Sequence, residues 1–316
     1  METYAERAAE VARRAGEVLF GKDREIREVL LAILANGHIL LEDIPGVGKT
    51  TLATAFSKTL DLDYRRVQFT PDVLPSDLTG FSVYRREQES FVYQPGIVFC
   101  NLLLADELNR TSPKTQSALL EAMQEGQVTA EGVTRQLPAP FLVIATQNHF
   151  GSAGTQSLPE SEADRFSISL SLGYPDLESE LKMARSVGAG RPAESLTPIL
   201  SRAELLAIQE EIQSVYIHDR IYRYIAELVR ATREHPMVAQ GAGPRATIAL
   251  VKLSKAAAWY AGRGFVTPAD VLEQFSYVAG HRVTLNADAI MKRVTVGEVL
   301  RKIAGSVRKP PIEVRR

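Results

Sequence analysis

Residues 39–53 constrain the fold of this chain more than any other stretch of its sequence. The apolar run 39–41 leads into a turn of proline and glycine, and Lys49 and Thr50 follow where a helical pattern begins. A strand, a glycine-rich loop and a helix N-terminus in this order form a cradle for phosphate groups, because backbone amides and the helix dipole favour an anion there. We therefore interpret this stretch as a nucleotide-binding loop. The residues expected to hold the nucleotide are Pro45, Gly46, Val47, Gly48, Lys49, Thr50 and Thr51.

One position of this loop departs from the usual pattern. The pattern G-x-x-x-x-G-K-[ST] asks for glycine at position 43, where this chain has Asp43. The alternative interpretation is a chance turn between two core elements. If the loop does bind phosphate, we expect the Asp43 carboxylate to be turned away from it, because a like charge there would oppose binding.

A second polar feature follows an apolar run, at the pair Asp106 and Glu107. Residues 102–105 predict a buried strand, and a charge at the end of such a strand is costly without a partner. Near a phosphate loop, Asp106 would bind the nucleotide's Mg²⁺ together with the Thr50 hydroxyl. Glu107 would then polarise the water that attacks the γ-phosphate. The alternative is a strand that simply reaches solvent at Asp106.

Asn148 follows the next apolar run and adds an uncharged hydrogen-bonding group. It would donate to the γ-phosphate or orient the attacking water, and the alternative is an ordinary turn residue at the end of a strand. His149 beside it could be a ligand or a base, although a single histidine on a loop is more often solvated.

Short apolar runs alternate with helical patterns in the first part of the chain, which predicts a parallel sheet covered by helices on both faces. The strands are expected at residues 38–41, 64–69, 101–106, 141–146 and 166–170, and two exposed hairpins at 81–93 and 126–136. After residue 175 we expect no further strands, only helices at 201–215, 219–235, 244–262, 267–279 and from about 286. We place an α/β nucleotide-binding domain at 1–190 and a helical lid domain at 191–316.

The overall composition argues against several classes of protein. The formal net charge of −1 does not suit a protein that coats nucleic acid. Cys100 is the single cysteine, so no intramolecular disulfide can form, which suits a reducing cytoplasm. No segment predicts a membrane span, and residues 1–27 lack the apolar core of a secretory signal. We therefore expect a soluble, cytoplasmic protein.

A series of short motifs follows the phosphate loop in the chain. They are Lys49-Thr50, Leu104-Ala105-Asp106-Glu107-Leu108-Asn109-Arg110, the run 113–123, Ala145-Thr146-Gln147-Asn148, Asp164-Arg165-Phe166 and Gly243-Pro244-Arg245-Ala246. Together they resemble the MoxR family of AAA+ ATPases, over most of the chain. The resemblance implies an AAA+ P-loop NTPase core, with a parallel sheet flanked by helices, followed by an all-α lid domain.

The same resemblance implies Mg²⁺-dependent hydrolysis of ATP in a ring of identical subunits, expected to be a hexamer. Such rings remodel or mature client proteins, often ones with a von Willebrand A domain. The two hairpins match insertions that tend to face the central pore of the ring.

The resemblance also gives roles to three further residues. Asn148 matches sensor 1, Arg165 matches the arginine finger that a neighbouring subunit inserts at the γ-phosphate, and Arg245 matches sensor 2, which reaches the same phosphate from the lid. From the residues alone, Arg165 would otherwise form a solvated ion pair with the acids before it. Arg245 lies at the predicted first turn of a helix, where a cation is disfavoured, so a functional role is favoured. His149 is a departure, since the family usually has proline there.

Two other functions stay open at this point. Related ring ATPases translocate DNA, and stimulation of ATP hydrolysis by DNA with a steep salt dependence would favour that function. In the first hairpin, however, Glu87 and Glu89 offset the charge of Arg85 and Arg86. The other is a nucleotide-sensing scaffold with little turnover, against which the intact pair of acids at 106–107 argues.

Overall fold

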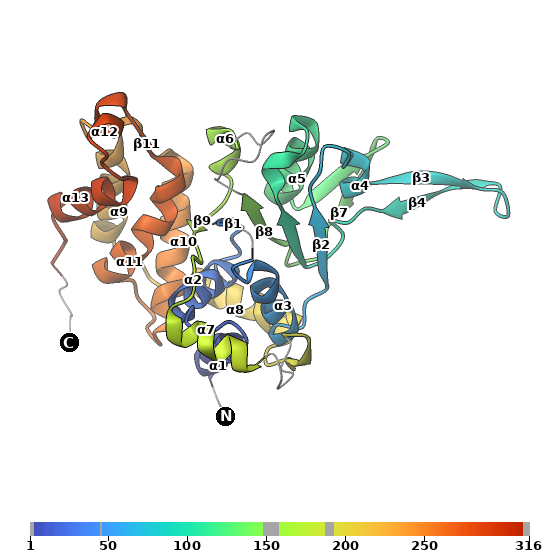
Figure 1. Ribbon diagram of the computed structural model, residues 1–316, viewed down its shortest axis with the longest axis horizontal. Coiled ribbons are helices and arrows are strands. Elements are labelled where there is room, and N and C mark those ends of the chain that lie inside the picture. Colours follow the sequence, from blue (N-terminus) through green and yellow to red (C-terminus); the bar gives the residue numbers. More distant parts are fainter. Residues whose placement is uncertain (1–2, 45, 148–157, 187–192, 312–316) are drawn as a thin grey trace.

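The computed structural model describes residues 3–44, 46–147, 158–186 and 193–311. At its centre lies a parallel sheet with the strand order β2-β5-β8-β1-β9 (Figure 1). The strands are β1(Ile39–Glu42), β2(Tyr64–Gln68), β5(Leu102–Asp106), β8(Leu142–Gln147) and β9(Ile168–Leu170). In the register, Gln68 lies opposite Asp106, and Glu42 lies opposite Gln147. The carboxyl ends of the strands therefore share one edge, and the predicted parallel sheet is confirmed.

Helices cover both faces of this sheet, which is why β1, β5 and β8 read as apolar runs, whereas the edge strand β2 is partly exposed and carries Arg65 and Arg66. Along β5, Leu102 and Leu104 belong to one buried cluster, whereas Leu103 and Ala105 belong to another, because side chains alternate along a strand. The first cluster includes side chains of α1(Tyr4–Gly16), α2(Asp23–Leu34) and α3(Lys49–Thr59). The second includes side chains of η1(Leu108–Arg110) and α5(Pro113–Glu125).

The two predicted hairpins are confirmed. The first, β3(Gly80–Arg85) with β4(Ser90–Pro95), follows α4(Pro75–Thr79) and extends away from the body of the molecule (Figure 1). The second is β6(Gln127–Ala130) with β7(Val133–Gln136). The Ser82 amide donates to Glu131 (2.9 Å), and the Arg135 guanidinium lies 3.5 Å from the centre of the Tyr93 ring. These contacts tie the two hairpins to each other.

The part of the chain after β8 is mainly helical. Its described helices are α6(Glu160–Ala163), α7(Leu177–Ser186), η2(Ala193–Ser195), α8(Arg202–Ser214), α9(Asp219–Glu234), α10(Pro244–Tyr260), α11(Pro268–Ala279), η3(Gly280–Arg282), α12(Ala287–Met291) and α13(Val296–Ser306). The prediction that no strand follows residue 175 is wrong, because β10(Val238–Gln240) and β11(Thr284–Leu285) pair antiparallel. Strands of three and two residues are too short to produce an alternating pattern.

The predicted last helix is also divided in two. After α12, Arg293 has a φ of 55°, which a helix does not accommodate. A capping box then begins α13, in which the side chains of Thr295 and Glu298 bind each other's backbone amides.

The hydrophobic core crosses the predicted domain boundary at residue 190. Buried side chains of α2, α8, α10 and α11 belong to one cluster. Gln209 of α8 donates to the carbonyl of Ile33 (2.9 Å), and Gln274 of α11 donates to the carboxylate of Glu28 (2.7 Å). The predicted boundary at residue 190 therefore does not separate two hydrophobic cores. The division into two domains stays a prediction.

The composition led to one expectation about Cys100, the single cysteine, and to another about membrane-spanning segments. Cys100 is buried, and burial raises the pKa of its thiol to about 12. Among the described residues, no helix is both long enough and apolar enough to span a bilayer.

Candidate active site

Residues 43–48 connect β1 to α3 at the carboxyl edge of the sheet. Gly46 and Gly48 have φ angles of 86° and 98°, a region that glycine adopts readily and other residues rarely. A Cβ at Gly48 would lie 2.5 Å from Leu19 Cδ1, so the end of the Leu19 side chain would have to shift, and the positive φ would strain any other residue at this position. Val47 is buried in the core beneath the loop, and Pro45 lies outside the described residues. The loop conformation thus depends on its glycines.

Lys49 begins α3, and its side chain is only 8% exposed. Its Nζ donates to the backbone carbonyl of Asp43 at 3.3 Å. Burial lowers the pKa of Lys49, and the charges of Asp106, Asp43 and Glu107 act in the opposite direction. Lys49, the single cation of the loop, therefore lies near three acids. A bound phosphate would be a further anion beside it.

The carboxylate of Asp43 is fully occupied by the segment that follows β9. It accepts hydrogen bonds from the Ser171 hydroxyl (2.7 Å), the Leu172 amide (2.6 Å) and the Gly173 amide (2.9 Å). The carboxylate is thus turned toward that segment, as the charge argument predicts. Asp43, which departs from the usual loop pattern, therefore connects the first position of the loop to the residues that follow β9.

The paired acids lie at the end of β5. Asp106 accepts hydrogen bonds from the Thr146 hydroxyl (2.7 Å) and from the Arg66 guanidinium (2.8 Å). Glu107 has φ 57° and ψ 45°, a left-handed conformation that is uncommon for a residue with a Cβ. Its amide donates to the same Thr146 hydroxyl (2.8 Å), and its carboxylate binds Arg110 (2.6 Å). One hydroxyl therefore holds both acids in place.

Thr146 and Arg66 were not identified as site residues from the sequence. The available signal for Thr146 was a polar residue within an apolar strand. Arg66 had no local signal, because its partner Asp106 lies 40 residues away in the chain. The predicted site residue Asn148 and its neighbour His149 lie outside the described residues.

Thr50 and Asp106 are the residues expected to hold Mg²⁺. Thr50 is exposed in the first turn of α3, followed by Thr51, and its hydroxyl is a suitable ligand for a hard cation. In the part of the chain that the structure describes, no three His, Cys, Asp or Glu residues form a metal-binding group. These residues fit Mg²⁺, because this ion is commonly bound by one or two protein oxygens together with phosphates of a substrate.

Arg165 and Arg245 lie at the opposite edge of the sheet, where the strands begin. Arg165 precedes β9, and its Nη1 donates to the carbonyl of Leu120 in α5 (3.0 Å). Arg245 lies in the first turn of α10, where its Nη2 donates to Gln124 Oε1 (3.1 Å) and its Nη1 lies 3.8 Å from Asp164 Oδ2. Both arginines line a cavity of about 150 Å³, which we call the arginine cavity.

The structure brings these two arginines together but does not bring them to the phosphate loop of the same chain. His38, the residue before β1, lines the arginine cavity, whereas the loop begins after Glu42 at the other end of this strand. At roughly 3.3 Å per residue, the four residues of β1 separate the two places by about 13 Å. The structure thus places Arg245 at the opposite end of β1 from the phosphate loop of its own chain, and its role as sensor 2 stays a prediction.

His38 and Arg282 fix the walls of the arginine cavity. His38 Nδ1 accepts from the Val143 amide (3.1 Å) and its Nε2 lies 2.9 Å from the Met123 carbonyl, so the ring is neutral and burial lowers its pKa to about 4. Arg282 of η3 donates from Nε to Asp164 Oδ1 (2.7 Å), and its side chain is only 3% exposed. Burial lowers the pKa of Arg282, and Asp164 opposes this effect. No local pattern identifies Arg282, because its partner lies 118 residues away in the chain.

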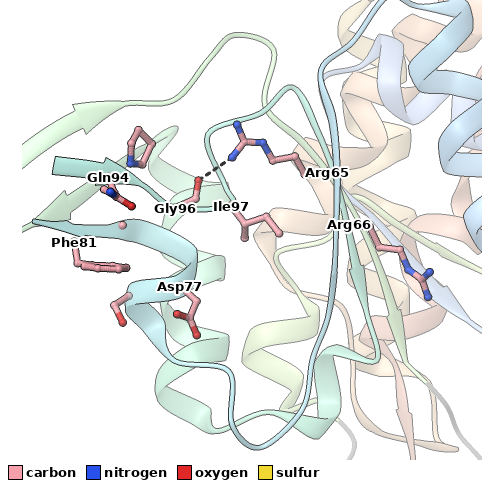
Figure 2. Close-up of a pocket in the computed structure, with 10 residues that line it drawn as sticks. Arg65, Arg66, Asp77, Phe81, Gln94, Gly96 and Ile97 are labelled. Atoms are coloured by element: carbon pink, nitrogen blue, oxygen red, sulfur yellow. Dashed lines mark hydrogen bonds between the residues drawn. The ribbon is translucent and has the colours of Figure 1, made fainter. Parts of the chain in front are cut away.

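A larger cavity of about 560 Å³ lies at the foot of the first hairpin and contains none of the predicted site residues. Figure 2 shows Arg65 pointing toward Gly96, to whose carbonyl it donates (3.2 Å), while Arg66 lies on the other side of the strand. The two neighbouring arginines of β2 therefore have different partners. Arg65 binds the foot of the first hairpin, and Arg66 binds Asp106.

The chain is similar to known proteins over most of its length. A model of the ATPase family associated with various cellular activities (AAA) matches residues 38–168, and a model of the AAA lid domain matches residues 230–303. The chain is 45% identical to the uncharacterized protein YeaC of Bacillus subtilis, covering 89% of this chain and 88% of that protein. It is 36% identical to Chaperone MoxR1 of Mycobacterium tuberculosis, covering 93% of this chain and 80% of that protein.

A crystal structure of a Cytophaga hutchinsonii protein, named as a candidate ATPase, has the same fold. It superimposes with a TM-score of 0.91 at 40% identity, over 98% of this chain and 96% of that one. The matches include the sheet with its phosphate loop and the C-terminal helices. The chain belongs to the MoxR family of AAA+ ATPases.

Proposed function

We propose that this protein hydrolyses ATP to ADP and phosphate with Mg²⁺, at sites shared between neighbouring subunits of a ring. The proposal rests on one observation, which is the separation of the predicted site residues. Lys49 and Asp106 lie at one edge of the sheet, and Arg165 and Arg245 lie at the other. A site divided in this way needs a second chain to complete it. A head-to-tail contact between chains closes into a ring when its rotation allows, and we propose a hexamer from the family resemblance.

Within one chain, the loop amides and Lys49 would bind the phosphates, while Thr50 and Asp106 would hold Mg²⁺. When bound, this ion neutralises charge on the phosphate oxygens. Glu107 would orient the attacking water and accept its proton, because it follows Asp106 directly at the carboxyl edge of the sheet. Asn148 is assigned to the γ-phosphate by the resemblance.

The neighbouring chain would supply the cations. Arg165 would contact the γ-phosphate and stabilise the negative charge that develops there during transfer. Arg245 lies beside it on the arginine cavity, so we propose that it serves the same neighbour rather than its own chain. The two arginines come from different parts of the fold, so a shift of the C-terminal helices would change how they meet the nucleotide.

The energy of hydrolysis would be used to remodel or mature a client protein in the cytoplasm. The two hairpins would contact the client at the pore, since the first extends from the body of the molecule (Figure 1). Clients with a von Willebrand A domain are proposed on the family resemblance alone.

Mixing inactive variants tests the shared site. Arg165→Ala should lower kcat by about 1,000-fold and leave nucleotide binding unchanged, because an arginine finger acts mainly on the transition state. Glu107→Gln should bind nucleotide without turnover. In mixed rings, a Glu107→Gln chain supplies its Arg165 to the intact loop of an Arg165→Ala chain. Phosphate release by the mixture should therefore exceed that of either variant alone.

Arg230→Ala is the matched control, because this exposed arginine pairs only with Glu234 in its own helix among the described residues. It should behave as the wild type. If no mixing ratio restores activity, the shared site is wrong. Strong stimulation by DNA that disappears with added salt would instead indicate a translocase. Tight nucleotide binding by the wild type without phosphate release would indicate a sensing scaffold.

A further inference from the structure

Lys252 lies on the arginine cavity together with Arg165 and Arg245. It follows Arg245 by seven residues in α10, which is about two helical turns, so the two cations project from the same face of the helix. Ile248 lies between them, lines the same cavity and is 58% exposed. This face of α10 therefore presents two cations and an exposed apolar side chain beside Arg165.

The charges around the arginine cavity are unbalanced. Its lining contains Arg165, Arg245, Lys252 and Arg282, whereas Asp164 is the single acid among the described lining residues. Asp164 binds Arg282 at 2.7 Å and lies 3.8 Å from Arg245, so it is already occupied.

Arg165 and Lys252 differ in accessibility, and of these two only Lys252 is exposed to an anion from outside the chain. Arg165 Nε is buried without a hydrogen-bond partner in the described part of the chain. Lys252 is exposed, and its charge is close enough to His38 to contribute to the lowered pKa of that ring, after the larger effect of burial. A cavity with this excess of positive charge attracts an anionic group.

The size of the cavity limits what the anion can be. Its volume of about 150 Å³ is below the roughly 300–1,000 Å³ of pockets that enclose a whole small-molecule ligand. It therefore suits one anionic group at the end of a larger ligand that lies outside, on another chain.

We propose that Lys252 is a third cation that contacts the terminal phosphate of the neighbouring subunit's nucleotide. This inference rests on the shared site proposed above. Its chemical role differs from that of the arginines, because an ammonium group acts as a compact point charge whereas a guanidinium forms a planar fork. Lys252 would neutralise the phosphate while the two arginines orient it.

Three substitutions test this role. Lys252→Met keeps the length of the side chain and removes its charge, and it should lower kcat by about 10-fold with nucleotide binding unchanged. Lys252→Arg keeps the charge and should retain most of the activity. Lys255→Met is the control on the same helix, because Lys255 donates to the Gln213 carbonyl (2.6 Å) and does not line the cavity. The readouts are steady-state phosphate release and binding of a fluorescent ATP analogue.

Mixing distinguishes an effect across the interface from damage within one chain. Adding Glu107→Gln chains to Lys252→Met chains should raise the phosphate release per Lys252→Met chain, because the added chains supply an intact Lys252. If Lys252→Met equals Lys255→Met while Arg165→Ala is inactive and recovers on mixing, the role of Lys252 is wrong and the shared site stands. If Arg165→Ala itself is fully active or never recovers, the shared site fails, and the role of Lys252 fails with it.

Discussion

The two ends of the strands in the central sheet differ in the charge of the side chains around them. We call them the carboxyl edge and the amino edge. At the carboxyl edge, each described acid is balanced within the chain: Asp43 by three donors, Asp106 by Thr146 and Arg66. At the amino edge, four cations line the arginine cavity around one acid. The first edge carries the residues expected to hold phosphates and a metal ion, and the second has an excess of positive charge among the described residues that line the cavity. In the proposed shared site, the carboxyl edge of one chain would meet the amino edge of its neighbour.

The largest effect that separates the two edges is expected from Lys49→Ala. Loss of a charged hydrogen-bond donor should weaken ATP binding by about 100-fold, measured by titration with a fluorescent analogue. Lys58→Ala is the control, because Lys58 is exposed on the same helix. The amino edge of such chains should stay functional, so Lys49→Ala chains should restore activity to Arg165→Ala chains. A failure to do so would mean that the two edges do not work independently.

A smaller effect is expected from Thr146→Val, which sharpens the account of the carboxyl edge. The hydroxyl donates to Asp106 and accepts from the Glu107 amide, so its loss should let both acids move. We expect kcat to fall by about 10-fold with little change in ATP affinity, since positioning is worth a modest factor. Thr134→Val in the second hairpin is the control. An unchanged kcat would show that Thr146 is dispensable for holding the acids.

The smallest expected effect is the pH dependence of stability caused by His38 at the amino edge. The pKa of His38 is about 4, below its ordinary value, so the unfolded chain binds more protons than the folded one between pH 6.5 and 4. The free energy of unfolding should therefore be highest above pH 6.5 and fall by roughly 2 kcal/mol as the pH drops to 4, discounted because His38 is not fully enclosed. Urea denaturation across this range measures the loss.

His38→Gln tests the assignment, because an amide keeps a donor and an acceptor without titrating. Part of the pH dependence should disappear in this variant. His281, whose pKa burial lowers to about 3, contributes with the same sign, and so does Glu204, whose pKa is lowered to about 2 by its hydrogen bond with Arg7. An identical pH profile in the variant and the wild type would remove His38 from this account.

The sequence by itself determined the features whose signals are local. The phosphate loop follows from residues within ten positions of one another, and its helix starts at Lys49 as predicted. The paired acids follow from an apolar run that ends in charge, and they lie at the end of β5. Parallel strands buried on both faces produce apolar runs, which located β1, β5, β8 and β9, whereas the edge strand β2 is partly exposed and has the sequence Tyr-Arg-Arg-Val-Gln.

Only the tertiary structure decided how distant residues meet. Arg165 lies 80 positions before Arg245 and 87 before Lys252, and no local pattern predicts that β9 and α10 place them on one cavity. The contact of Thr146 and Arg66 with Asp106 depends on the strand order, and the short β10–β11 pair depends on two loops meeting. Side-chain periodicity reports which face of an element is buried, not which other element covers it. Local signals in the sequence therefore identified the candidate site residues, and the packing of strands and helices placed them at two different edges of the sheet.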